Sequence, residues 1–228
     1  MSIVAMTADE LFDNVVDEML GLDDCDLSRC KKEIVNANLV LLDPTRNTMC
    51  ECRRHMSIRY AIGELLWYQS RKNTASSIAP FSKFWQRISD DGEHVNSNYG
   101  WCIRDKYGFD QWEMIKKVLM NNSDSRQAVM HIKEARDIIE SPTKDLNCTI
   151  ALQFILRNNK LDLITTMRSN DIWLGLPYDV FNFTCMQIQM AMELGVEVGV
   201  YCHNVGSLHM YEQDYLKLVG GTCNDITE

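Results

Sequence analysis

The sequence lacks a surplus of positive charge. Its 23 lysines and arginines stand against 32 aspartates and glutamates, which gives a formal net charge of −9. Proteins that bind nucleic acids neutralise phosphates with an excess of lysine and arginine. We therefore expect no nucleic-acid partner, and we expect any bound phosphate to be held by a few local arginines.

Long apolar runs are also missing, since no stretch approaches the roughly 20 residues of a membrane-spanning helix. The N-terminal segment contains Asp9, Glu10 and Asp13 and lacks the basic and apolar regions of a signal peptide. We therefore expect no membrane association and a cytoplasmic location.

The nine cysteines do not form an evident disulfide framework, because their number is odd and no export signal is present. Reduced thiols are the better interpretation. Cys50, Cys52 and His55 lie close together, but their spacing fits no common zinc pattern. We expect no metal site.

Repeats, low-complexity tracts and linkers are absent, and 228 residues suit one domain. The sequence therefore predicts a single domain over residues 1–228, with residues 218–228 as a flexible tail. Strand and helix patterns mix without a regular βαβ alternation, which indicates the α+β class.

Local signals place several elements of this domain. Capping residues predict helices after Thr7, Ser57 and Asp110, and Pro177 suits the first turn of another helix. Apolar stretches predict strands over 34–42, 127–132 and 197–201. Two further apolar segments flank Arg157-Asn158-Asn159-Lys160, which predicts a hairpin because asparagine tolerates positive φ.

This hairpin carries the main functional hypothesis. Its outer ends bear Cys148 and Arg168, and adjacent antiparallel strands would bring the two residues side by side. A guanidinium beside a thiol lowers the pKa of the thiol and makes it a nucleophile. The alternative is an inert buried thiol, which is the commoner state of a free cysteine.

Two carboxylates are further candidates. Glu64 lies among Ile62, Leu65 and Trp67, so it is either a partly exposed helix residue or a buried acid with a raised pKa. In the second case it is a candidate general acid or base. Asp179 follows Pro177 near a predicted helix start, where a carboxylate can simply interact with the helix dipole.

Several segments, in their order along the chain, resemble motifs of the thymidylate synthase superfamily, from about Ile34 to Tyr211. They are Gly63-Glu64-Leu65-Leu66-Trp67, Asp124-Ser125-Arg126, Cys148, Arg168-Ser169-Asn170-Asp171 with Leu174-Gly175-Leu176-Pro177, and His209-Met210-Tyr211. Each motif alone would be a weak signal, but together and in order they are strong.

The resemblance implies an α+β domain whose mixed β-sheet is flanked by helices, and a homodimer that forms through the sheet. Arg126 of one subunit would then reach the phosphate site of the other. The implied substrate-binding residues are Arg29, Arg126, Arg168, Ser169, Asn170, Asp179, His209 and Tyr211. The residues implied to bind 5,10-methylenetetrahydrofolate are Trp85, Asp171 and Gly175.

Asp179 departs from the thymidylate synthase pattern, which has asparagine at this position. A side-chain amide pairs with O4 and N3–H of uracil, whereas cytosine presents an amino group at C4 and an unprotonated N3. A carboxyl group can accept from the amino group and, when protonated, donate to N3. Phage deoxycytidylate hydroxymethylases, a subgroup of the superfamily, carry aspartate here and are the nearer resemblance.

This subgroup implies an enzyme that converts dCMP, methylenetetrahydrofolate and water to 5-hydroxymethyl-dCMP and tetrahydrofolate, in the host cytoplasm if the gene is phage-encoded. Cys148 would add to C6 of the pyrimidine as a thiolate kept by Arg168. Tyr99, with ordered water, would help to remove the C5 proton. Glu64 would organise the water that completes the hydroxymethyl group.

Alternatives of two classes stay open. One is a related enzyme: a thymidylate synthase that makes dTMP from dUMP, or a hydroxymethylase that acts on dUMP or CMP. The other is a catalytically silent homologue that only binds nucleotide.

Overall fold

The computed structural model describes residues 1–25, 27, 30–138 and 143–220. A six-stranded sheet forms its centre, with the strand order β1-β2-β6-β5-β4-β3. The strands are β1 (Ser2–Ala5), β2 (Cys30–Leu41), β3 (Val129–His131), β4 (Thr149–Arg157), β5 (Lys160–Asp171) and β6 (Glu197–Tyr211). β1 pairs parallel with β2 and β5 parallel with β6, while the other pairs are antiparallel, so the sheet is mixed.

The helices complete an α+β fold, as expected from the sequence. They are α1 (Ala8–Leu20), α2 (Ile58–Ser70), α3 (Ala75–Ile78), α4 (Phe84–Ile88), α5 (Tyr99–Arg104), α6 (Gln111–Asn121), α7 (Leu176–Leu194) and α8 (Glu212–Val219), with a short 3-10 helix, η1 (Ala135–Ile138). Among the described residues, no helix is both long and apolar enough to span a bilayer.

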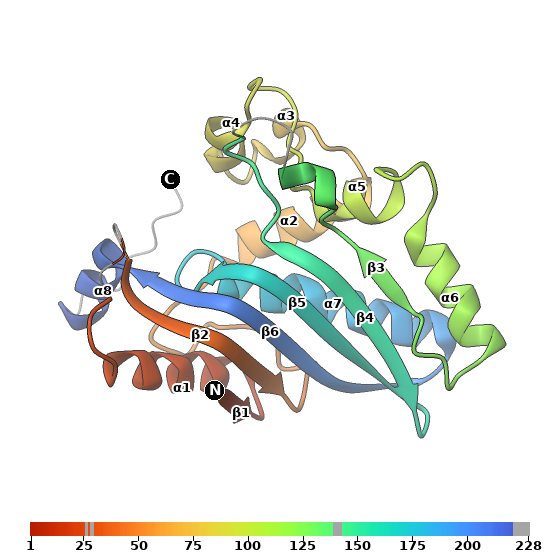
Figure 1. The fold of residues 1–228 in the computed structure, drawn as a ribbon, viewed down its shortest axis with the longest axis horizontal. Coiled ribbons are helices and arrows are strands. Elements are labelled where there is room, and N and C mark those ends of the chain that lie inside the picture. Colours follow the sequence, from red (N-terminus) through yellow and green to blue (C-terminus); the bar gives the residue numbers. More distant parts are fainter. Residues whose placement is uncertain (26, 28–29, 139–142, 221–228) are drawn as a thin grey trace.

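The two faces of the sheet differ. Across the four central strands, Leu152, Thr165, His203 and Leu39 lie in one row and are completely buried. They face the layer of helices, in which α7 packs on β5 and β6 and α1 packs on β1 and β2. Figure 1 shows α7 behind the sheet.

The opposite face carries the row formed by Gln153, Ile164, Cys202 and Val40, whose side chains are only partly buried. In Figure 1 this face of the four central strands points toward the viewer, and no helix of the described chain lies in front of it. The sheet is therefore covered on one side and open on the other.

The β4–β5 hairpin forms as the sequence predicts. Asn158 and Asn159 make its turn with φ values of 50° and 62°. The left-handed region is more accessible to asparagine than to most other residues because its short side chain can hydrogen-bond locally. The pairing runs from Arg157–Lys160 to Thr149–Met167, which brings the two outer ends of the hairpin together.

The C-terminal part of the described chain differs from its sequence-based description. The strand predicted over 197–201 continues to Tyr211, because alternation of buried and partly exposed side chains persists along it. Leu218 and Val219, predicted to begin the tail, instead belong to α8. Acidic residues in the first turn of α8 and Lys217 in its last turn favour this helix through its dipole.

Candidate active site

Cys148 lies immediately before β4 and is half-buried. The backbone N–H of Arg168 donates to the Cys148 carbonyl at 2.9 Å, and Nη2 of Arg168 lies 3.6 Å from Sγ of Cys148. The guanidinium also donates to the carbonyls of Asn147 and Leu146, each at 3.1 Å. Register and side-chain hydrogen bonds together place the thiol and the guanidinium side by side, which was the central prediction from the sequence.

One part of the prediction, that the thiol of Cys148 has a lowered pKa, is wrong. Arg168 does lower the pKa of Cys148, but burial of the sulfur has the larger effect, and the net result is a pKa above the ordinary value. Asp179 adds to the increase, while Lys133 opposes it. In the protein without a ligand, Cys148 is therefore held as a thiol beside a cation, and not as a thiolate.

Glu64 is buried in α2, with 4% of its surface exposed, so the exposed alternative is wrong. The Tyr60 hydroxyl donates to Oε1 and Nδ2 of Asn182 donates to Oε2, both at 2.8 Å. Burial raises the pKa of Glu64 to about 7, although hydrogen bonds from Tyr60, Tyr68 and Asn182 favour the charged form. A carboxyl group with this pKa can accept or release a proton near neutral pH.

Asp179 lies in the first turn of α7 and accepts a hydrogen bond from Nδ2 of Asn170 at 2.7 Å. Burial and, to a smaller extent, the nearby Glu64 raise its pKa to about 8, against the effect of the Asn170 hydrogen bond. Asp179 therefore keeps its proton at neutral pH. This environment goes beyond the interaction with the helix dipole that was the alternative interpretation.

Gly175 precedes α7 and makes room for this pair. A Cβ atom at this position would lie 2.8 Å from Nδ2 of Asn170 and 3.4 Å from Oδ2 of Asp179. Any larger residue would push the amide away from the carboxyl group. The structure thus gives Gly175 a steric role beside Asn170 and Asp179.

Tyr99 begins α5 and reaches the same region. Asp145, three residues before Cys148, accepts hydrogen bonds from the Ser97 hydroxyl and from the backbone N–H groups of Asn96 and Ser97. The loop of Cys148 and the loop of Tyr99 are thereby tied together. Burial, with Asp179 and Cys148 nearby, raises the pKa of Tyr99 well above its ordinary value, so its hydroxyl is protonated.

The predicted phosphate residues are placed differently from one another. Within the described residues, Arg168 makes no ion pair and can take an anion. Ser169 pairs with Ser207 of β6 in the sheet and is half-buried. Arg126 is exposed, and its guanidinium makes no hydrogen bond or ion pair with another described residue, so this chain does not bring it to Cys148. Arg29 lies outside the described residues.

The predicted sugar residues His209 and Tyr211 end β6, with ring centroids 5.0 Å apart. His209 is paired in the sheet with Asp171, the last residue of β5. The carboxyl ends of the two parallel strands thus lie together, three residues beyond Arg168 on β5. Ligands commonly bind at such carboxyl ends of parallel strands.

Comparison with known families decides the assignment. A sequence profile of the family described as thymidylate synthase matches residues 43–220, which is most of the chain. The chain belongs to the thymidylate synthase family.

Three relatives illustrate where in this family the chain lies. A deoxyuridylate hydroxymethyltransferase of Bacillus phage SP01 is 33% identical over 196 residues, 81% of this chain and 51% of that protein. A deoxycytidylate 5-hydroxymethyltransferase of Enterobacteria phage T4 is 29% identical over 167 residues, 68% of each chain. A deoxyuridylate hydroxymethyltransferase of Pseudomonas phage M6 is 29% identical over 176 residues, 76% of this chain and 50% of that protein. The chain thus spans about half the length of the deoxyuridylate relatives.

In this member of the thymidylate synthase family, the predicted folate residues Trp85 and Asp171 have different surroundings, and only Trp85 joins the hydrogen-bond network of Glu64. Nε1 of Trp85 donates to the Tyr60 hydroxyl at 2.9 Å, and the same hydroxyl donates to Glu64. Oδ1 of Asp171 accepts from the backbone N–H groups of Trp173 and Leu174 at 2.7 and 3.2 Å. Its Oδ2 has no donor among the described residues.

Sequence reasoning missed several residues of the site. Tyr60, one helical turn before Glu64, could have been found from its i−4 spacing. Asn182 and His203 are far away in sequence, and only packing brings them to Glu64 and Asn170. Lys133, whose buried Nζ has no hydrogen-bond partner among the described residues, adds a second cation near Cys148.

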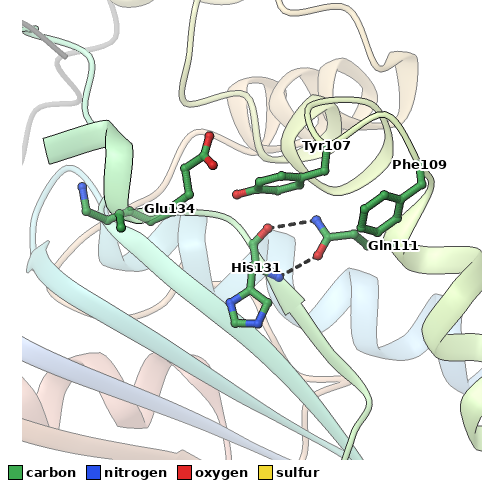
Figure 2. Close-up of a pocket in the computed structure, with 7 residues that line it drawn as sticks. Tyr107, Phe109, Gln111, His131 and Glu134 are labelled. Carbon is green, nitrogen blue, oxygen red and sulfur yellow. Dashed lines mark hydrogen bonds between the residues drawn. The ribbon is translucent and has the colours of Figure 1, made fainter. Parts of the chain in front are cut away.

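A separate cavity of about 350 Å³ lies at the sheet edge formed by β3, and none of the predicted site residues lines it. Figure 2 shows the Gln111 side chain against the backbone of His131. Its Nε2 donates to the His131 carbonyl at 2.9 Å, and its Oε1 accepts from the His131 N–H at 2.8 Å. The cavity is therefore a feature of the sheet edge, and its lining shares Lys133 with the surroundings of Cys148.

Proposed function

We propose that the chain is a folate-dependent pyrimidine nucleotide 5-hydroxymethyltransferase that acts on dCMP. Methylenetetrahydrofolate and water would be the co-substrates, and the reaction would pass through a covalent bond between Cys148 and C6 of the base. The relatives described above are hydroxymethyltransferases, which supports this class of reaction, while the choice of base depends on Asp179.

The observation that carries the choice of cytosine is the protonated carboxyl group of Asp179. With a pKa of about 8, it presents both a donor and an acceptor at neutral pH. Cytosine needs a donor for N3 and an acceptor for its amino group. An aspartate kept neutral by burial meets both needs without placing an unpaired charge against the base.

Cys148 supplies the nucleophile in this reaction. Its sulfur forms a bond to C6, and electron density moves to C5, which becomes nucleophilic. Arg168, 3.6 Å from Sγ, would stabilise the thiolate as it forms and would bind the nucleotide phosphate together with Ser169. Because burial holds the thiol protonated, we expect the thiolate to form after nucleotide binding.

The residues of the folate region fit a ligand with amino and ring N–H donors. Oδ2 of Asp171 is available as an acceptor, and Trp85 offers a half-buried aromatic face beside α2. Bound methylenetetrahydrofolate would supply the one-carbon unit at the oxidation level of formaldehyde. Tyr99, which is protonated, would hold an ordered water near C5 and so help to transfer the C5 proton.

Glu64 would organise the water molecule that adds in the last step to give the hydroxymethyl group. Oδ1 of Asn182 is buried beside it and has no donor among the described residues. A buried acceptor without a protein donor usually binds an ordered water. A water donating to Asn182 would lie next to a carboxyl group with a pKa of about 7, which can take up its proton.

A homodimer would complete the phosphate site. The open face of the sheet carries partly buried apolar side chains, including Ile164 and Val40, and a second copy could cover it. Arg126 is exposed, and its guanidinium makes no hydrogen bond or ion pair with another described residue, as expected of a residue that reaches a partner subunit.

Deoxyuridylate hydroxymethylation is the second candidate, because two of the relatives carry that name. A protonated carboxyl group can also pair with uracil if its donor and acceptor are exchanged. A silent nucleotide-binding homologue is a further possibility of a different class. Release of tritium from C5 of the nucleotide in the absence of folate would rule it out, because the release requires attack by Cys148.

Replacement of Asp179 by Asn tests the choice of base. We expect the ratio of kcat/KM for dCMP to that for dUMP to fall by about 100-fold, because an amide matches uracil. Products would be identified by mass spectrometry, with Asp23→Asn, an exposed site, as the matched control. Formation of 5-hydroxymethyl-dUMP alone by the unsubstituted protein would reject dCMP, and an unchanged ratio in the variant would reject the role of Asp179.

A further inference from the structure

A chain of buried side chains leads away from Asp179 into the protein. Asn170 joins Asp179 to His203 through Oδ1, which lies 3.1 Å from Nε2 of the histidine. On the other side of the ring, Nδ1 lies 2.6 Å from the Tyr201 hydroxyl. Tyr201 and His203 are completely buried, and Asn170 is 4% exposed. None of the sequence motifs pointed to Tyr201 or His203.

The hydrogen bonds of this chain have one direction. Nδ2 of Asn170 donates to Asp179, so Oδ1 of the amide, a pure acceptor, faces His203. Nε2 of His203 must then carry a proton. Burial lowers the pKa of His203 to about 3, so the ring is neutral and Nδ1 is bare. The Tyr201 hydroxyl fills that position by donating to Nδ1.

The direction has a consequence for Asp179. Oδ2 accepts from Asn170, which leaves the acidic proton on Oδ1. We propose that Tyr201 and His203 are positioning residues that fix the Asn170 amide, and through it fix Oδ1 of Asp179 as the donor and Oδ2 as the acceptor toward the base. They would thereby set the preference for cytosine over uracil without touching the nucleotide.

This inference rests on the proposed function, and it explains how a symmetric group can discriminate. A free carboxylic acid can carry its proton on either oxygen and so can match either base. Cytosine needs the donor at N3 and the acceptor at the 4-amino group, whereas uracil needs the reverse. If one oxygen of Asp179 is held as the acceptor, only one of the two donor–acceptor arrangements remains. Because Gly175 has no side chain, the Asn170 amide can approach Asp179 closely enough to hold that oxygen.

The test removes the outermost atom of the chain. Tyr201→Phe keeps the buried ring but deletes the hydroxyl, so Nδ1 of His203 loses its donor and the amide of Asn170 is free to turn. We expect the ratio of the dissociation constants for dUMP and dCMP, measured by calorimetry, to fall by about 10-fold, the effect of one hydrogen bond. Tyr107→Phe is the matched control, because its hydroxyl bonds to the Ile132 carbonyl elsewhere.

A second measurement needs neither ligand nor variant. Nitrogen-15 NMR of the unsubstituted protein should show His203 as the neutral Nε2–H tautomer at neutral pH. The Nδ1–H tautomer, a charged ring, or an unchanged base ratio in Tyr201→Phe would each overturn the inference while the proposed function stands. If the unsubstituted protein binds neither nucleotide, the proposed function fails and the inference falls with it.

Discussion

The two ends of the candidate site are built in different ways. At the sulfur end, Cys148 and Arg168 are adjacent because of strand register, and the guanidinium is held by backbone carbonyls. At the acid end, Glu64 and Asp179 come from two helices, and side-chain hydrogen bonds from Tyr60, Asn182 and Asn170 hold them.

The two ends therefore differ in what controls the protonation of their reactive groups. The thiol is half-buried beside a cation, and its reactivity depends on what enters the site. Glu64 is buried and Asp179 is partly buried, and the raised pKa values of both are set by the protein itself. The sulfur end therefore responds to the nucleotide, while the acid end is prepared before the nucleotide binds.

Loss of the sulfur should have the largest effect. Cys148→Ser should reduce product formation from dCMP by about 10³-fold or more, because the hydroxyl is a far weaker nucleophile. Release of tritium from C5 should fall equally, since it requires the same bond to C6. Cys185→Ser, a half-buried thiol of α7, is the control. Substantial tritium release by the Cys148 variant would show that the sulfur end has been assigned to the wrong residue.

Loss of the acid at position 64 should affect product formation more than it affects the attack by Cys148. Glu64→Gln should lower formation of 5-hydroxymethyl-dCMP by about 100-fold, in the range of general acid–base contributions. Tritium release should decrease much less, because Cys148 still attacks C6. Equal losses in both assays would mean that Glu64 supports the first step and not the final addition of water.

The raised pKa of Asp179 should be measurable as a pH dependence of the free energy of unfolding. This is the smallest of the predicted effects. The pKa of Asp179 rises from 3.8 to about 8 on folding, so the folded state binds its proton more tightly. The associated stabilisation is complete below the unfolded pKa and is lost as the pH rises through the folded pKa. Between about pH 5 and pH 7, the free energy of unfolding of the unsubstituted protein should fall by on the order of 2–3 kcal/mol more than that of Asp179→Asn.

Urea unfolding at a series of pH values would measure this difference. The raised pKa of Glu64 contributes a slope of the same sign in both proteins, and only its interaction with Asp179 differs between them. Parallel stability curves would indicate that the Asp179 carboxyl group is solvated in the folded protein.

The sequence alone predicted that Cys148 and Arg168 lie side by side, because local rules determine this arrangement. Two asparagines at a turn set the hairpin, and the hairpin sets which residues are opposite each other. The same reasoning fails for the pKa of Cys148, because burial depends on helices that pack from elsewhere. Proximity to Arg168 was predicted correctly, but its effect on the thiol was not the dominant one.

The acid end was only partly accessible from the sequence. The motif around Glu64 and the unusual aspartate at position 179 identified two residues and their roles as hypotheses. Nothing local shows that Asn182, which is 118 residues beyond Glu64, donates to it. The buried chain through His203 likewise depends on how β5 and β6 lie under α7, which no single segment specifies.

The Gln111 side chain has a consequence for assembly. Its amide occupies both outward backbone groups of His131, on a strand that is only three residues long. Another polypeptide therefore finds no vacant peptide group there to continue the sheet sideways. Strand addition is therefore disfavoured at this border, because an incoming strand would first have to displace the Gln111 amide from His131.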